Sequence, residues 1–206
     1  MKFSEKNLLI FDYDGTIADT SKLHAKAYSH IFNPKIKNFL YEKIAGLKTI
    51  DGIKYYFEEN NIKLKDSNLK KLVYKKQEIF RNLIEIELNP IPGVIDFLIW
   101  TKDKYNLTIA SSGSKKSVLK GLKILGIEKF FDLIICSEDV KIAKPDPEIF
   151  NKVIAISKIN KKNALIFEDS NNGILAAYNA NIDCIDIRKN SFIDLLNLFK
   201  ENDNKY

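Results

Sequence analysis

A short apolar segment that runs directly into two acidic residues constrains the fold of this chain more than any other feature. Residues 8–11 are all apolar, Asp12 and Asp14 follow at once, and Gly15 comes next. An unbroken apolar run of this length is typical of a strand that is buried on both faces of a parallel sheet. The two acids would then lie at the carboxyl end of that strand, where open α/β sheets bind their ligands. Gly15 favours a sharp turn just beyond them.

The closeness of Asp12 and Asp14 also has a chemical meaning. Two neighbouring carboxylates repel each other unless a cation or a shared proton compensates their charge. The pair therefore indicates either a divalent-metal site or a division of roles between a nucleophile and an acid. An ordinary Asp-Gly turn after a strand explains the same residues without any chemistry. The rest of the chain decides between these interpretations.

Later segments predict the sheet to which the first strand belongs. Strand-like and helix-like segments alternate beyond residue 88, and this pattern favours a parallel sheet covered by helices. We expect strands at residues 7–13, 107–111, 132–136, 163–168 and 182–187, and helices at 93–104, 114–125, 146–157, 172–180 and 191–200.

The segment between the first strand and this region has a different character. Apolar residues recur there at helical spacing in three stretches, residues 20–33, 36–59 and 66–87. An all-helical block is thus inserted at the ligand-binding edge of the sheet, where it could serve as a lid. The predicted fold class is α/β, a Rossmann-like parallel sheet core with an inserted all-helical cap domain. The predicted domains are a core of residues 1–18 and 88–206 and a cap of residues 19–87.

Composition limits the partners that such a protein would have. The net charge is +6, but only Arg81 and Arg188 among the 33 basic residues are arginine, and the lysine-rich stretch 63–76 carries acids and apolar residues at helical spacing. That stretch indicates a solvated helix face, and we expect no nucleic-acid partner. No apolar run approaches the ~20 residues that span a bilayer, so we expect no membrane partner. Residues 1–7 lack an apolar signal core, and we expect a cytoplasmic monomer.

Two further segments carry residues that suit a phosphate ligand. Ser111 ends one expected strand, and Ser112 and Gly113 follow it, so that hydroxyl and backbone N–H groups could bind phosphate oxygens. The same residues also suit an ordinary turn before a helix. Lys144 precedes Pro145, and its ammonium group would neutralise charge near the paired carboxylates, although a surface lysine fits this position equally well.

A second acidic pair ends another expected strand. Glu168 and Asp169 follow the apolar stretch that begins at residue 164. Asp169, Asp12 and the backbone carbonyl of Asp14 would together form an oxygen cage of the kind that Mg²⁺ prefers. An acidic cap on the following helix is the alternative, but two strand-end acid pairs at one sheet edge favour a site.

These segments, taken in order, resemble the four motifs of the haloacid dehalogenase-like phosphohydrolases. The resemblance rests on residues 12–16, Ser111, residues 144–147 and residues 168–173, and it covers nearly the whole chain. The helical insertion resembles the small cap of the β-phosphoglucomutase and phosphoglycolate phosphatase branch. Asn181 departs from the pattern, because relatives usually have glycine in this turn.

The resemblance implies a role for each matching residue. Asp12 would be the nucleophile that forms an aspartyl-phosphate, and Asp14 would protonate the leaving alkoxide and then activate water. The residues implied to hold the phosphoryl group are Thr16, Ser111, Ser112 and Lys144. Those implied to hold Mg²⁺ are Asp12, Asp14 and Asp169, with Glu168 as a further candidate.

Two cap residues are candidates for contacts with the substrate. His24 lies ten residues after Asp14, the spacing found in related sugar phosphomutases, although a hinge or surface histidine fits as well. Lys48 lies in a loop that resembles the one with which relatives read their substrates, although it could equally be a solvated lysine. Phosphomutases typically carry arginine where this chain has Thr49, and this difference argues against a mutase.

We therefore predict a Mg²⁺-dependent phosphatase that acts on a small phosphomonoester, such as a phosphorylated sugar or a related metabolite. A sugar phosphomutase on the same scaffold is the alternative. A non-catalytic phosphate-binding domain is a third interpretation, but such a domain would not need both Asp12 and Asp14.

Overall fold

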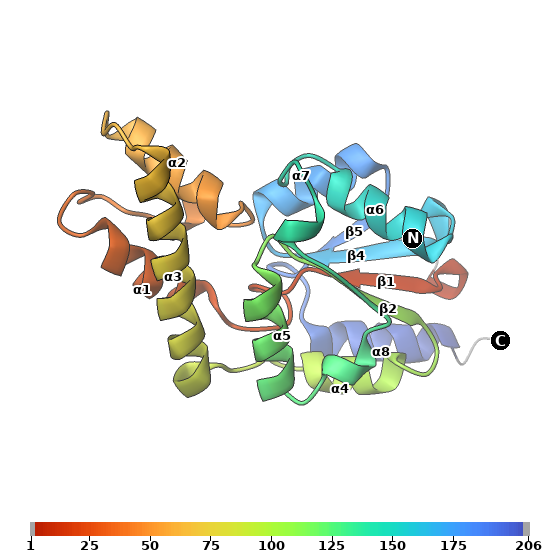
Figure 1. The fold of residues 1–206 in the computed structure, drawn as a ribbon. Coiled ribbons are helices and arrows are strands. Elements are labelled where there is room, and N and C mark those ends of the chain that lie inside the picture. Colours follow the sequence, from red (N-terminus) through yellow and green to blue (C-terminus); the bar gives the residue numbers. More distant parts are fainter. Residues whose placement is uncertain (1–2, 204–206) are drawn as a thin grey trace.

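Five parallel strands form one sheet in the larger part of the molecule (Figure 1). The computed structural model describes residues 3–203. The strands are β1 (Leu8–Phe11), β2 (Asn106–Ala110), β3 (Leu133–Ile135), β4 (Ala164–Glu168) and β5 (Asp183–Asp186), in the spatial order β3-β2-β1-β4-β5. The predicted Rossmann-like parallel sheet is thereby confirmed, with β1 as its central strand.

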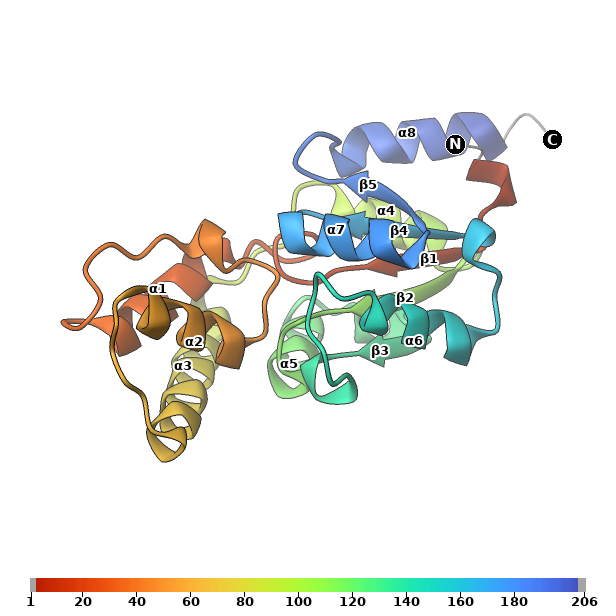
Figure 2. The same ribbon diagram turned by 90° about the horizontal axis from the view of Figure 1, so that it is seen from above.

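Helices cover both faces of this sheet (Figures 1 and 2). One face packs against α4 (Val94–Thr101), α5 (Lys115–Ile124) and α8 (Phe192–Asp203), and the other packs against α6 (Glu148–Ser157) and α7 (Asn171–Ala180). Leu9 and Phe11 of β1 belong to the first apolar cluster, and Leu8 and Ile10 belong to the second. All four side chains are fully buried because the strand alternates its residues between two covered faces.

The register of the sheet brings three strand ends to one edge. Phe11 of β1 is aligned with Ile109 of β2 and with Phe167 of β4. The backbone N–H of Asp12 then donates to the carbonyl of Phe167 at 3.0 Å. The residues that follow β1, β2 and β4 therefore meet at the carboxyl edge of the sheet, as parallel strands require.

Three helices form a separate unit beside that edge, which we call the cap (Figure 1). They are α1 (Ser21–Phe32), α2 (Thr49–Glu59) and α3 (Asp66–Glu87), and they enclose apolar clusters of their own. The two linkers to the core lie side by side, because Ile91 N donates to Ile17 O at 2.8 Å and Asp19 N donates to Asn89 O at 2.9 Å. The cap is therefore joined to the core by two adjacent, hydrogen-bonded linkers.

Two local predictions were wrong. Residues 36–59 do not form one helix, because α2 begins only at Thr49 and the preceding segment contains a short 3-10 turn at Tyr41–Lys43. Gly46 in that segment has a φ of +79°, in the left-handed region, so a right-handed helix cannot continue through it. Helix α6 begins at Glu148 rather than at residue 146, and the Asp146 carboxylate accepts the Glu148 N–H at 2.8 Å.

Shorter 3-10 turns complete the chain at Phe3–Glu5, Glu128–Phe130, Ser137–Asp139 and Lys161–Asn163. Within residues 3–203, no helix combines the length and the apolar character that crossing a membrane would need.

Candidate active site

A buried lysine joins two carboxylates at the carboxyl edge of the sheet. Lys144 is 1% exposed, and its Nζ donates to Asp12 Oδ1 at 2.6 Å, to Glu168 Oε2 at 2.8 Å and to Ala110 O at 3.0 Å. Burial alone would lower the pKa of Lys144, but Asp12 and Glu168 outweigh that effect and raise the pKa above its usual value. The ammonium group is therefore held charged beside the Asp12 carboxylate.

Asp12, Glu168 and Asp169 form an acidic cluster around this lysine. Oxygen atoms of the three carboxylates lie within 4.8 Å of one another. Burial, and next the charge of Glu168, raise the pKa of Asp12, and the same two causes raise the pKa of Asp169 to about 7. The single positive charge of Lys144 therefore does not balance the charge of the three carboxylates. A divalent cation would relieve the repulsion, and an all-oxygen donor set suits a hard cation such as Mg²⁺.

The contacts of Glu168 distinguish it from the other two acids. Its Oε2 accepts from Lys144, and its Oε1 accepts from Ser170 N at 3.2 Å and from Ser170 Oγ at 2.9 Å. Gly173 of α7 packs directly against this carboxyl group, because a Cβ there would lie 2.0 Å from Glu168 Cδ. Protein groups therefore occupy both oxygens of Glu168, and its main structural effect is to orient Lys144.

Asp14 lies on the other side of Asp12, toward the cap. Thr20 Oγ1 donates to Asp14 Oδ1 at 2.7 Å, and His24 Nε2 lies 2.9 Å from the same oxygen. Burial raises the pKa of Asp14, but His24, Thr20 and the more distant charge of Lys76 outweigh burial and keep it below its usual value. These contacts favour the anionic form of Asp14, which can accept a proton.

Sequence reasoning missed Lys76 of α3. Its stretch was interpreted as a solvated face, yet Lys76 is 2% exposed and its Nζ lies 2.5 Å from His24 Nδ1. Burial lowers the pKa of Lys76 to about 7. A donated Lys76 N–H leaves the His24 proton on Nε2, facing Asp14. The signal was present in the sequence, because Lys76 follows Leu69 and Val73 on the apolar side of α3 and precedes Phe80 by four residues.

A pocket opens between the core and the cap above these groups. It holds about 30 Å³ of free volume. The core side is lined by Asp12, Asp14, Ser112, Gly113, Asp169 and Ser170, and the cap side by Ser21, His24, Tyr28, Tyr41, Ile44–Leu47, Thr49 and Lys76. A ligand in this pocket would touch both units at once.

Of the expected phosphate ligands, Ser112 lines this pocket, whereas Thr16, Ser111 and Lys144 are buried and do not line it. Thr16 is fully buried and its Oγ1 lies 3.3 Å from Asp169 Oδ1. Ser111 is also fully buried, and its Oγ accepts the Gly113 N–H at 2.9 Å. Lys48 does not line the pocket, because its Nζ donates to backbone carbonyls of the core at residue 140 and residue 141.

Comparison with known proteins places this arrangement in a family. The sequence matches the profile of the haloacid dehalogenase-like hydrolases over residues 9–187. It is 33% identical to a phosphorylated carbohydrates phosphatase of Thermotoga maritima, over 86% of this chain and 82% of that protein. It is 27% identical to the fructose-1-phosphate phosphatase YqaB of Escherichia coli, over 87% of this chain and 95% of that protein.

Solved structures agree on the fold. The chain superposes on β-phosphoglucomutase of Clostridium difficile with a TM-score of 0.82 and 24% identity, over 95% of this chain and 98% of that one. The chain therefore belongs to the haloacid dehalogenase-like hydrolase family, as its four motifs indicated. It is an enzyme of the phosphoric monoester hydrolase class.

Proposed function

We propose that this enzyme is a Mg²⁺-dependent phosphatase of small phosphorylated carbohydrates and that it works through an aspartyl-phosphate on Asp12. The observation that carries the proposal is the placement of Asp12, whose carboxylate is held by Lys144 at the floor of a pocket closed by the cap. Asp14 lines the same pocket two residues further on.

In the first half-reaction, a carboxylate oxygen of Asp12 attacks the phosphorus atom and forms a P–O bond. The ester P–O bond breaks, and its electron pair leaves with the alkoxide oxygen. Asp14 donates to that oxygen the proton that it took from water in the preceding turnover, and the alcohol departs. Lys144 and the hydroxyl groups of Thr16 and Ser111 stabilise the charge on the phosphoryl oxygens.

In the second half-reaction, a water molecule attacks the aspartyl-phosphate. Asp14, now an anion, accepts a proton from the water as its oxygen bonds to phosphorus. The bond between phosphorus and Asp12 breaks, which restores the carboxylate and releases inorganic phosphate. His24 and Thr20 favour the anionic form of Asp14 that this step requires.

A bound Mg²⁺ would supply positive charge to the attacking carboxylate and to the phosphoryl oxygens. The residues that fit it are Asp12, Asp169 and the backbone carbonyl of Asp14. Within residues 3–203, no backbone N–H pairs with that carbonyl. We assign Glu168 to orienting Lys144 rather than to the metal, because Lys144 bonds to one of its oxygens and Ser170 to the other.

The cap side of the pocket supports a neutral carbohydrate as the leaving group. Tyr28, Tyr41 and Thr49 line it with aromatic surface and hydroxyl groups. Among the described residues, Lys76 is the only lysine or arginine of the lining. A polyol would find hydrogen-bond partners here, whereas a second phosphate group would find one buried amine instead of a bidentate guanidinium. The carbohydrate phosphatase at 33% identity agrees with this class.

A sugar phosphomutase is the second candidate, and the contact between His24 and Asp14 favours it. A mutase must hold a bisphosphate and keep water away from the aspartyl-phosphate. Thr49 lines the pocket at the position where mutases typically carry arginine. We therefore expect water to be the acceptor of the phosphoryl group. Incubation with β-glucose 1-phosphate and a catalytic amount of the 1,6-bisphosphate tests this. Rapid glucose 6-phosphate formation with little free phosphate would replace the hydrolase proposal with the mutase.

The decisive experiment is substitution of the nucleophile. Asp12→Asn keeps the shape of the side chain but removes the attacking oxygen, so turnover of the best substrate in a panel of phosphorylated carbohydrates should fall by a factor of 10³ or more, on the order expected for loss of a covalent nucleophile. The matched control is Asp19→Asn, because Asp19 is an exposed acid in the linker. Asp12→Asn with near-normal turnover would refute the mechanism.

A further inference from the structure

The loop just before α2 is one of the places where the cap contacts the core. This loop comprises residues 44–48, just before α2, and we call it the cap loop. Asn172 of α7 donates from Nδ2 to Ala45 O at 2.9 Å. Gly46 lies so close to Ser170 that a Cβ would be 2.4 Å from the serine Oγ. The cap loop therefore rests directly on the segment that follows Asp169.

Lys48 ends the cap loop and reaches a second core segment. Its Nζ donates to Val140 O at 2.6 Å and to Lys141 O at 3.3 Å. Backbone carbonyls are present whatever the pocket contains, so the contact does not depend on a substrate. The ammonium group of Lys48 carries three N–H donors, so it can donate to both carbonyls at once.

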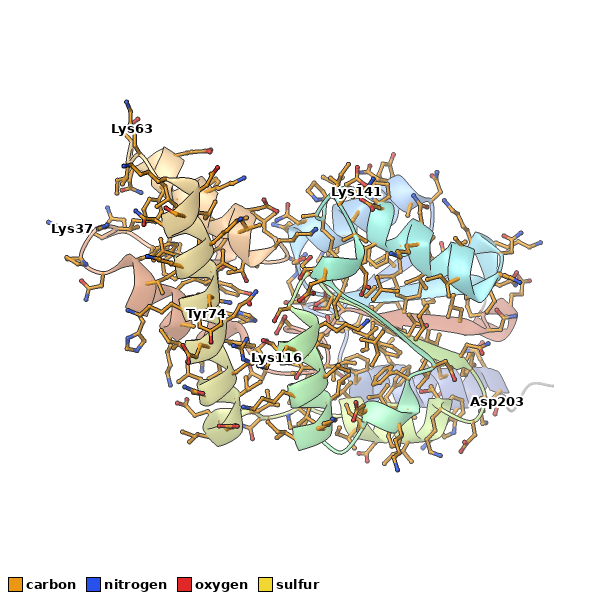
Figure 3. The ribbon with its side chains drawn as sticks, in the orientation of Figure 1. Lys37, Lys63, Tyr74, Lys116, Lys141 and Asp203 are labelled. Carbon is orange, nitrogen blue, oxygen red and sulfur yellow. The ribbon has the colours of Figure 1, made fainter. Side chains whose placement is uncertain are left out.

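The core segment that receives Lys48 is itself held in place. The Glu148 carboxylate accepts the N–H of Lys141 at 2.9 Å and the N–H of Ile142 at 2.7 Å. These two backbone contacts lower the pKa of Glu148. The segment lies on the upper side of the core in Figure 3, where Lys141 is labelled, and it leads within three residues to Lys144. Lys48 thus attaches the cap to the segment that carries the buried catalytic lysine.

We propose that Lys48 and Asn172 form a two-point latch that holds the cap closed on the core before any substrate is bound. This inference deepens the proposed function, because the latch joins the cap to the two segments that carry Lys144 and Asp169. Lys48 is then a positioning residue: it touches no substrate and acts by fixing the cap over the pocket. The pocket beneath the closed cap holds only about 30 Å³, so the latch has to open before a phosphorylated carbohydrate can enter.

Small-angle scattering of the ligand-free enzyme tests the latch directly. Lys48→Met keeps the apolar stem of the side chain and removes its donors. The equilibrium constant for cap closure should fall roughly tenfold, which is the low end of the loss expected for hydrogen bonds from a charged donor in a half-exposed site. The radius of gyration should therefore increase. The matched control is Lys54→Met, which removes an exposed lysine from α2 and should leave the scattering curve unchanged.

A second variant and a second readout keep the test decisive. Asn172→Ala removes the other contact and should also open the cap, and it replaces Lys48→Met if that variant does not fold. The affinity for inorganic phosphate should fall by up to tenfold in each variant, because closure contributes to binding. Neither readout needs turnover, so a failed phosphatase assay would leave this test intact. Scattering and phosphate affinity that match those of Lys54→Met would overturn the latch.

Discussion

Lys76 offers a quantitative test of the electrostatics beneath the cap. Burial lowers its pKa from 10.5 to about 7, whereas in the unfolded chain the pKa returns to its ordinary value. Between these two pH values the unfolded state binds one proton more than the folded state, so the stability of the folded protein rises with pH. The charged, buried amine lowers the free energy of unfolding by its full amount below pH 7. This destabilisation disappears as the pH rises from 7 to 10.5. A shift of this size corresponds to about 5 kcal/mol at most.

Lys76→Met removes this proton linkage and leaves an apolar side chain between Tyr28 and Phe80, whose rings lie 4.4 and 5.0 Å from the lysine Nζ. The free energy of unfolding of the variant minus that of the parent should therefore decrease by about 2–3 kcal/mol between pH 8 and pH 10. Urea unfolding at several pH values measures it, and staying above pH 8 limits the titration of His24.

Lys75→Met is the matched control, because Lys75 is the exposed neighbour on the same helix. The free energy of unfolding of Lys75→Met minus that of the parent should not change over that pH range. A flat difference for Lys76→Met as well would show that Lys76 keeps an ordinary pKa, and it would refute our account of the pocket.

Further predictions concern the acidic cluster and its packing. Removing divalent metal with EDTA should abolish activity and Mg²⁺ should restore it, while Asp169→Ala should raise the Mg²⁺ concentration needed by at least tenfold, or abolish turnover; full activity of the metal-free enzyme would refute the metal site. Gly173→Ala should lower the free energy of unfolding by about 1–3 kcal/mol, as overpacking does, because the new Cβ would overlap Glu168. It should also reduce turnover by displacing the partner of Lys144, and a fully active, equally stable Gly173→Ala would contradict this packing.

Much of the candidate site could be located from the sequence because parallel strands impose where their carboxyl ends lie. Once Asp12, Ser111 and Asp169 were each placed after a buried strand, the sheet had to bring them to one edge, and the aligned register of β1, β2 and β4 does so. Lys144 follows no strand directly, so the four-motif resemblance was needed to place it. The structure shows its ammonium group inside the acidic cluster.

The cap was harder to predict, for a physical reason. A lysine in an amphipathic helix is normally solvated, and composition cannot reveal that α3 buries Lys76 against α1. Only its position between Val73 and Phe80 indicated the apolar side. The helix predicted over residues 36–48 was wrong for another reason. The apolar residues of this segment pack from irregular backbone, although their spacing resembles that of a helix. Gly46, with its positive φ, interrupts a helix there.

Two lysines of the cap act on the core through different chemistry. Lys48 donates to backbone carbonyls and controls whether the cap is closed. Lys76 contacts His24, which in turn contacts Asp14, and so it controls the charge around the acid–base group. The two contacts lie on different elements and share no residue, so their effects should be separable. Loss of the first should open the cap, whereas loss of the second should raise the pKa of Asp14 while the cap stays closed.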